Sequence, residues 1–416
     1  MTFLNVVEIE SALVALNHAH PSLTELIPLP NETFEHRQSN ALLIRGNPWF
    51  ECRPAVVFIS GVHAREWGGP DILVNLATDL LEAYSTNAGL AYGGKVFAAD
   101  VIRSIVDRTD VVVFPDVNPD GRAYSMSAPA NSAQAMWRKN RNPASSGGVA
   151  TRIGVDVNRN YDFLWNFPIT FAPNVGPAST DPAYDTFYGT GPFSEPESRN
   201  VQWLVDRFPG ARYFVDVHSY TGLVLYPWGD DQNQTTDPSM SFRNSAWDGK
   251  RGIANDAYRD YVPAWRLAEL QTAAAVMRDG IFAVRDESYV SEQGFSLYPT
   301  SGTSEDWAFT REFISPSRGK LSGFVIEFNK NIDFFPTWAE MVELIADIDA
   351  GLLALCAYAR PGRFAVILCW IRNRFWAILH RVFPPELWGP YGPWDRIVQV
   401  FREIPKLISR VIGRMG

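Results

Sequence analysis

The sequence predicts an α/β fold: one large domain with a mixed, mostly parallel sheet covered by helices on both faces, and a helical extension at the C-terminus. Two observations predict it. Four short, buried-looking strand segments are separated by stretches with helical spacing, the pattern that gives parallel strands. The chain has 416 residues, of which 46% are hydrophobic and 20% charged, enough to bury a large core.

The first elements are expected before residue 61. Apolar residues recur at helical spacing over residues 5–20, which indicates a helix. Residues 26–46 are rich in turn formers and end near an Ala-Leu-Leu-Ile run. A buried strand is predicted over residues 56–60, because this short β-branched run lies between Pro54 and Gly61.

A helix is expected from Pro70 and Asp71 to about Ala83, because proline fits the first turn and an acidic residue suits the positive end of the helix. Three more buried strands are predicted over residues 111–114, 214–217 and 323–328, and a last amphipathic helix over residues 344–359. Residues 229–262 are rich in Asp, Asn and Gly and are interpreted as a surface excursion.

Residues 361–416 differ in composition from the rest, which we take as one large domain, residues 1–360. This tail holds nine arginines and lysines but three acidic residues, a net charge of +6, and four tryptophans. Two arginines near the middle of its most apolar part argue against a membrane-spanning helix. Two interpretations remain open: helices packed on the acidic body or another subunit, and a basic amphipathic segment in peripheral contact with a membrane.

Charge and cysteine content exclude several classes of protein. The net charge of −9 argues against binding to nucleic acid. Cys52, Cys356 and Cys369 are too few and too scattered for a disulfide framework or a cysteine-based zinc site. The first ten residues lack the basic start of a secretory signal, so we expect a cytoplasmic or peripheral membrane location, with secretion left open if the true start lies upstream.

A histidine and a carboxylate with metal-ligand spacing follow the first predicted strand. His63 and Glu66 lie three residues apart directly after residues 56–60, and His218 ends the strand at residues 214–217. Ligand sites in such sheets cluster beyond the strand ends. Two imidazoles and one carboxylate suit one Zn²⁺ ion with a position left open for water.

Further segments extend this pattern along the chain. They are His-Ala-Arg-Glu-Trp at 63–67, Asn-Pro-Asp-Gly at 118–121, Trp-Arg-Lys at 137–139, Asp-Val-Asn-Arg-Asn-Tyr at 156–161, His-Ser-Tyr at 218–220, Tyr-Pro-Thr-Ser-Gly at 298–302 and Phe-Val-Ile-Glu-Phe at 324–328. In these segments, and in their order, the chain resembles the zinc metallocarboxypeptidases of the carboxypeptidase A/B type from about residue 5 to 359. The resemblance implies that family's fold and a zinc exopeptidase.

The resemblance also implies catalytic roles. His63, Glu66 and His218 would hold the zinc ion, and Asp156 would orient the first histidine. Glu327 would act as the general base on the attacking water. Arg138 would polarise the scissile carbonyl and stabilise the oxyanion.

The substrates implied are the C-termini of peptides and proteins. Asn158 and Arg159 match the segment that grips the terminal carboxylate, a task for which the arginine fork is suited. Tyr298 matches a mobile tyrosine that closes over the substrate, and Arg65 is a further candidate for substrate binding.

Specificity is expected to depend on Glu305, seven residues after Tyr298, where the family has the floor of its specificity pocket. A carboxylate there favours a C-terminal Lys or Arg, as in B-type enzymes. Gly229 also agrees with the A/B group. The alternative is an A-type preference for aromatic or aliphatic termini.

Two other functional classes are open. One is a related zinc peptidase or amidase acting on cell-wall peptides or side-chain glutamates. The other is a non-enzymatic binding protein on the same scaffold, which would need the loss of a ligand or of the base; the sequence retains both.

Overall fold

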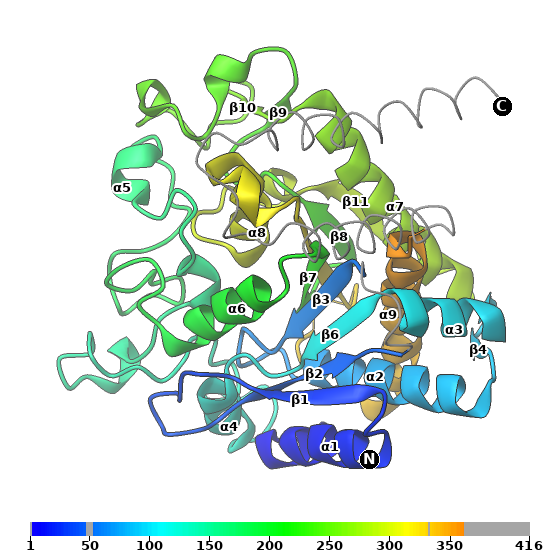
Figure 1. Ribbon diagram of the computed structural model, residues 1–416. Coiled ribbons are helices and arrows are strands. Elements are labelled where there is room, and N and C mark those ends of the chain that lie inside the picture. Colours follow the sequence, from blue (N-terminus) through cyan, green and yellow to red (C-terminus); the bar gives the residue numbers. More distant parts are fainter. Residues whose placement is uncertain (1, 47–52, 332, 362–416) are drawn as a thin grey trace, which may run out of the picture. The chain divides into compact units, whose positions relative to one another are not determined.

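The computed structural model describes residues 2–46, 53–331 and 333–361 (Figure 1). Its strands are β1 Thr24–Pro28, β2 Asn40–Ile44, β3 Ala55–Ser60, β4 Leu90–Tyr92, β5 Lys95–Phe97, β6 Asp110–Phe114, β7 Ala211–Ser219, β8 Leu223–Tyr226, β9 Asn233–Gln234, β10 Asp260–Tyr261, β11 Val290–Gln293 and β12 Ser322–Phe328. Within these residues, eight strands form one sheet in the order β1-β2-β6-β3-β7-β12-β8-β11.

The centre of the sheet is parallel and its flanks are mixed. Strands β6, β3, β7 and β12 run parallel to one another. The pairs β1–β2, β2–β6 and β12–β8 are antiparallel. These four central strands are the four predicted from the sequence. Strands β3 and β6 are buried throughout, as expected for strands covered on both faces. The predicted mixed, mostly parallel sheet is confirmed.

Helices lie on both sides of the sheet. They are α1 Val6–Ala19, α2 Gly68–Thr86, α3 Ala99–Arg108, α4 Pro119–Met126, α5 Phe167–Thr170, α6 Pro196–Arg207, α7 Ala264–Arg285, α8 Ser304–Ile314 and α9 Trp338–Ala359. Figure 1 shows α2, α3, α7 and α9 to one side of the strands and α6 and α8 to the other. The predicted coverage of both faces is therefore confirmed.

Side-chain caps mark the first residues of helices α1 and α9. Helix α1 starts after Asn5, whose side chain accepts from two backbone N–H groups of the first turn. Helix α9 starts at Trp338, six residues before the predicted residue 344, because Thr337 and Glu340 form a capping box. Helix α2 starts at Gly68, two residues before Pro70.

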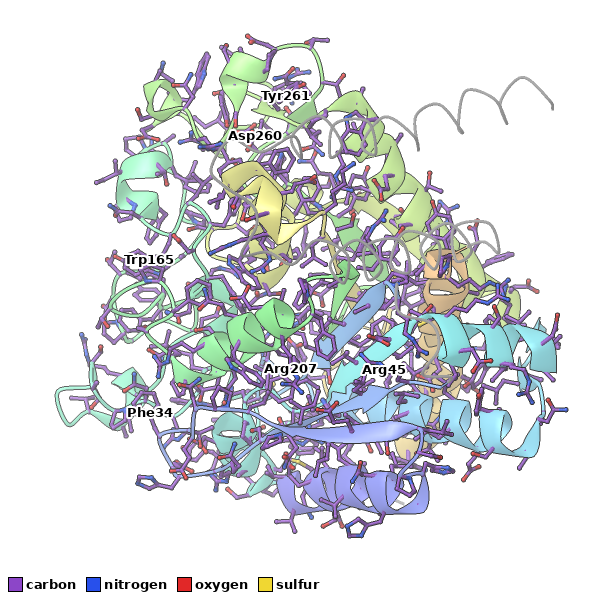
Figure 2. The ribbon with its side chains drawn as sticks, in the orientation of Figure 1. Phe34, Arg45, Trp165, Arg207, Asp260 and Tyr261 are labelled. Atoms are coloured by element: carbon purple, nitrogen blue, oxygen red, sulfur yellow. The ribbon has the colours of Figure 1, made fainter. Side chains whose placement is uncertain are left out.

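Two interpretations of the sequence are incomplete. Residues 26–46 are not only rich in turn formers: they contain strand β2 and most of the edge strand β1, which pair with each other along five residues. Residues 229–262 are not a plain surface excursion: Asp230, Arg251 and Asp260 are fully buried, and β9 pairs with β10, whose Asp260 and Tyr261 are labelled in Figure 2. These buried charges contact mainly groups of the segment itself, and Arg251 also donates to the carbonyl of Thr170 outside it, at 3.2 Å. The polar composition did not reveal this buried network.

The predicted tail, apart from Pro361, lies outside the described residues, as do Cys52 and Cys369. Cys356 is a buried free thiol, in agreement with the expectation. None of the helices in the described ranges combines the length and apolar character needed to cross a lipid bilayer.

Candidate active site

The candidate metal ligands come from two neighbouring strands. His63 and Glu66 lie on the turn between β3 and α2, and His218 is the penultimate residue of β7, which pairs with β3. Gly61 makes the turn possible: it has φ of +67°, and a Cβ at this position would lie 2.9 Å from Asp116 Oδ1. The chain can therefore turn sharply after β3 and place both side chains beside the end of β7.

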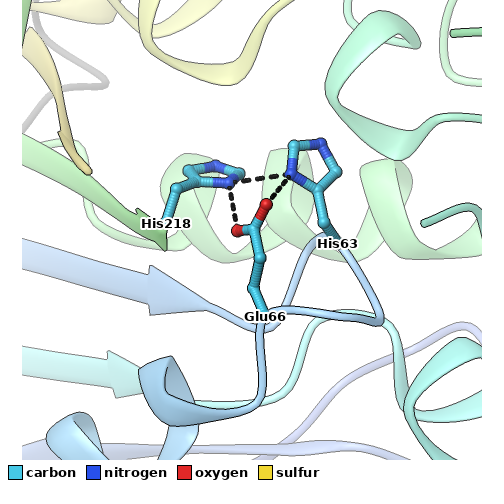
Figure 3. Close-up of side chains that lie close together, drawn as sticks. All are labelled: His63, Glu66 and His218. Atoms are coloured by element: carbon cyan, nitrogen blue, oxygen red, sulfur yellow. Dashed lines mark hydrogen bonds and ion pairs between the residues drawn. The ribbon is translucent and has the colours of Figure 1, made fainter. Parts of the chain in front are cut away.

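The ligand atoms of these three side chains converge on one point (Figure 3). Glu66 Oε1 lies 2.7 Å from His63 Nδ1, Glu66 Oε2 lies 2.9 Å from His218 Nδ1, and the two Nδ1 atoms are 3.1 Å apart. All three residues are buried, with at most 5% exposed surface. Among the described residues, no other group of three His, Cys, Asp or Glu side chains converges in this way.

The donor set fits a zinc ion. Bonds of about 2.1 Å in a tetrahedral site place neighbouring ligand atoms roughly 3.4 Å apart, so a slight spreading of the three side chains would admit the ion. Two imidazole nitrogens facing each other also need either a proton or a cation between them. Three protein ligands leave a fourth position open.

A carboxylate lies behind each histidine. Asp156 Oδ1 is 3.3 Å from His63 Nε2, and Asp216 Oδ2 is 3.0 Å from His218 Nε2. Such partners fix ring orientation and make the opposite nitrogen a better ligand. Asp156 was predicted, whereas Asp216 was missed. Its signal was available, since Asp216 precedes His218 by two residues on one strand and therefore points to the same face.

The charges of the cluster are mutually adjusted. Burial raises the pKa of Glu66, but the two histidines more than offset this and hold the pKa below its usual range. Burial lowers the pKa of His218, but Asp216 and Glu66 raise it well above the usual value. The site thus holds the ionised carboxylate of Glu66 beside the imidazole of His218, and a bound cation would interact favourably with both.

Glu327 lies beside the triad. It is the register neighbour of His218 in the parallel pair β12–β7, so both side chains point to the same face. Burial raises the pKa of Glu327 to about 8, with Glu66 adding to the rise and His218 and Arg138 opposing it. A cation bound at the triad would lower this pKa again.

The pocket is also lined by Arg138, Asn158 and Arg159. Arg138 Nε donates to Asp156 Oδ2 at 2.9 Å, so the carboxylate behind His63 also fixes this guanidinium. Arg159 donates to the carbonyls of Pro177 and Asn158, at 2.8 and 2.7 Å. Both arginines are buried yet line the pocket. Arginines fixed in this way form a preorganised binding surface for anionic oxygen atoms.

Tyr298 and Arg65 lie at the pocket's mouth. Tyr298 is 46% exposed, and its ring centroid is 5.9 Å from the guanidinium of Arg159. Arg65 pairs with Asp185 at 3.0 Å and lies 4.6 Å from the ring centroid of Phe334. The sequence interpretation missed Phe334, which carried no recognisable motif.

One cavity of about 200 Å³ unites these residues. Of the predicted site residues, its walls include His63, Arg65, Glu66, Arg138, Asn158, Arg159, Tyr298, Glu305 and Glu327. His218 and Asp156 lie behind the wall, at 1% and 0% exposure. The structure therefore gathers every predicted site residue, from segments spread over more than 260 positions, into one place.

Glu305 is held in place by the sheet below it. A Cβ on Gly323 of β12 would lie 2.1 Å from the carbonyl oxygen of Glu305, so the two backbones are in direct contact. We expect Gly323→Ala to destabilise the fold by about 1–3 kcal/mol, the usual range for overpacking, and to displace Glu305. Urea unfolding would measure the first effect and a crystal structure of the variant the second. An unchanged unfolding midpoint would contradict the close packing.

Comparison with known proteins supplies a family. The profile of the family described as zinc carboxypeptidase matches residues 9–344. Metallocarboxypeptidase A of Trichophyton tonsurans is 35% identical over 203 residues, 48% of this chain and 41% of that protein. Carboxypeptidase B of Astacus astacus is 27% identical over 258 residues, 62% of this chain and 66% of that protein. The matched segment thus spans less than half the length of the fungal relative.

The fold also matches a solved structure. Bovine thrombin-activatable fibrinolysis inhibitor, in complex with tick carboxypeptidase inhibitor, superposes with a TM-score of 0.63 at 19% identity, over 86% of this chain and 97% of that one. At this identity the likeness concerns the fold alone.

Proposed function

This chain belongs to the zinc carboxypeptidase family, and on that premise we propose that it hydrolyses the last peptide bond of peptides and proteins and releases their C-terminal residue. One observation carries the proposal: a single cavity is lined by His63 and Glu66 of the His-Glu-His triad, by the half-buried carboxylate of Glu327 and by an arginine suited to a terminal carboxylate.

The chain's own residues supply the proton transfer. A Zn²⁺ ion held by His63, Glu66 and His218 would polarise a water molecule and the scissile carbonyl. Glu327, next to His218, takes the proton from the attacking water and later delivers it to the leaving amine. Desolvation of the Glu327 carboxylate raises its pKa to about 8, which makes it a stronger base.

Arg138 stabilises the oxyanion that forms when the carbonyl is attacked. Its ion pair with Asp156, at 2.9 Å, fixes the guanidinium before substrate arrives. Because the donor is already oriented, it needs no reorganisation when the oxyanion forms. One such donor typically stabilises the transition state by about 3–4 kcal/mol.

Arg159 and Asn158 bind the terminal carboxylate. Arg159 keeps its orientation through its bonds to two carbonyls, and Asn158 accepts from Ser304 N at 2.8 Å, which fixes the amide. A chain that continued past this point would meet the clamp, so exopeptidase activity is favoured over internal cleavage. Tyr298, exposed at the mouth, is placed to cover the bound terminus.

We further propose a preference for C-terminal Lys or Arg, because Glu305 places a carboxylate in the cavity wall. No lysine or arginine among the described residues forms an ion pair with it, and its Oε2 has no hydrogen-bond partner. Burial raises the pKa of Glu305, and a cationic substrate side chain would relieve the cost of this buried acid.

A panel of short peptides with varied C-termini, assayed with and without a chelator, tests both proposals. We expect chelator-sensitive release of the last residue and higher kcat/KM for Lys and Arg termini than for Phe and Leu. Glu305→Ala is expected to lower kcat/KM for the basic termini by about 100-fold, as for removal of one partner of a buried ion pair.

The outcomes separate the alternatives. Higher activity on Phe or Leu would overturn the basic preference but not the carboxypeptidase. Cleavage only of cell-wall peptides or of side-chain glutamates would favour the related amidases. Chelator-insensitive release would contradict the metal site.

A further inference from the structure

The part of the pocket around Glu305 holds two hydrogen-bond acceptors that lack a donor. Glu305 Oε2 and Thr300 Oγ1 are both buried, and neither has a hydrogen-bond partner. Both residues line the cavity, together with the apolar side chains of Leu225, Leu297 and Val325. An apolar channel that ends at a carboxylate and a hydroxyl suits an alkyl chain with a donor group at its tip.

The wall of this pocket at Thr300 is rigid, because Thr300 packs against Gly229. Gly229 is fixed from both sides: its N–H donates to the carboxylate of Asp306 at 3.0 and 3.1 Å, and its carbonyl accepts from Thr300 N at 2.8 Å. A Cβ on Gly229 would lie 2.2 Å from Thr300 Oγ1 and 2.8 Å from Asp306 Oδ2. The hydroxyl of Thr300 is therefore packed against a rigid backbone turn.

Glu305 cannot withdraw either. Its backbone touches Gly323 on β12, where even a methyl group would collide with the carbonyl of Glu305. The backbone of Glu305 is therefore fixed, and its side chain, one methylene longer than that of aspartate, lines the cavity.

These features distinguish the two basic side chains. A lysine ammonium is compact and offers three donors, which can turn to a carboxylate and a hydroxyl at once. An arginine guanidinium is planar, wider and reaches further, and it binds best where two parallel acceptors face its fork. The hydroxyl of Thr300 and the carboxylate of Glu305, which come from two different residues, do not offer that arrangement.

We propose that this pocket selects C-terminal lysine over C-terminal arginine, with Thr300 and Glu305 as the two specificity-determining residues; the proposal rests on the carboxypeptidase function proposed above. Thr303 also lines the cavity, and its hydroxyl donates to Asp306 at 3.2 Å and lies within hydrogen-bonding reach of Glu305.

The test compares kcat/KM for otherwise identical peptides ending in Lys, Arg, ornithine and norleucine. We expect Lys to exceed Arg by about tenfold or more, and Thr300→Val, which keeps the shape but removes the hydroxyl, to lower the Lys value by about tenfold. Norleucine has no donor at its tip, so the loss in Thr300→Val is expected for Lys and not for norleucine, and the urea unfolding midpoint of the variant reports on folding.

Two further variants sharpen the result. Glu305→Asp shortens the acid by one methylene and is expected to shift the preference towards Arg. Thr272→Val, the same chemical change at an exposed position of α7, is expected to leave the Lys/Arg ratio unchanged.

An Arg value equal to or above the Lys value, or a Thr300→Val variant with an unaltered Lys/Arg ratio, would overturn the proposal. Failure to release any C-terminal residue, including Phe and Leu, would instead overturn the carboxypeptidase function.

Discussion

Replacement of Glu327 by glutamine is expected to lower kcat by about 10³-fold, within the range that a general base contributes. The amide keeps the shape of the side chain but cannot accept the proton of the attacking water. Glu327 is no member of the triad, so the bound zinc is expected to remain. The measurement is kcat on a C-terminal Lys peptide, with zinc content determined by elemental analysis on the same sample.

The matched control is Glu82→Gln, an exposed position on α2, which is expected to keep full activity. Glu327→Gln activity within about tenfold of the parent would contradict its role as the base, because such a loss is below what acid–base catalysis supplies. Loss of zinc in the same variant would assign Glu327 to the metal site instead. The two readouts together therefore separate proton transfer from metal binding.

The sequence predicted the part of the fold that carries its own pattern. Strands β3, β6, β7 and β12 contain short apolar runs and are buried at nearly every position, because helices cover both faces of the sheet. Strands β1 and β2, at one end of the sheet, were missed, since five-residue segments with intervening turn formers resemble loops. Their place in the sheet depends on the pairing of β2 with β6, which their own composition does not reveal.

The same division holds for the candidate site. The triad could be predicted because His63 and Glu66 are neighbours in sequence and lie at a strand end. The double contact of Asp156 could not be predicted: its two oxygens contact His63 and Arg138 separately, at 3.3 and 2.9 Å, and so connect a candidate metal ligand to the guanidinium of Arg138. That link depends on tertiary geometry, which spacing along the chain does not encode.

The part of the pocket around Glu305 shows most clearly what could not be predicted from the sequence. Glu305 was predicted from its distance to Tyr298, but the unpaired hydroxyl of Thr300 and the closed turn at Gly229 became visible only in three dimensions. Hydrogen-bond satisfaction is a property of the packed interior, so an acceptor without a donor leaves no mark in the sequence.

Replacement of His63 by alanine is expected to remove stoichiometric zinc and, with it, measurable peptidase activity. The parent is expected to hold one zinc ion per chain after dialysis. Loss of a partner behind a metal ligand costs about 10–100-fold in affinity, so loss of a direct ligand is expected to weaken binding by at least 100-fold. Zinc content after dialysis and kcat/KM on a C-terminal Lys peptide measure the two effects.

His36→Ala is the matched control, since the His36 side chain is 88% exposed and lies far from the triad in sequence. It is expected to keep zinc and activity. A His63→Ala variant that retained one zinc per chain would place the metal elsewhere and contradict the site.

Thermal unfolding adds a readout independent of catalysis. Zinc binds the folded state alone, so the parent's Tm is expected to rise with added zinc and fall with a chelator, whereas the Tm of His63→Ala is expected to respond to neither. The chelated parent should regain activity with zinc, and the variant should not. This difference follows from the geometry: without His63, Glu66 and His218 remain as two ligands at 2.9 Å, too few to define a tetrahedral site.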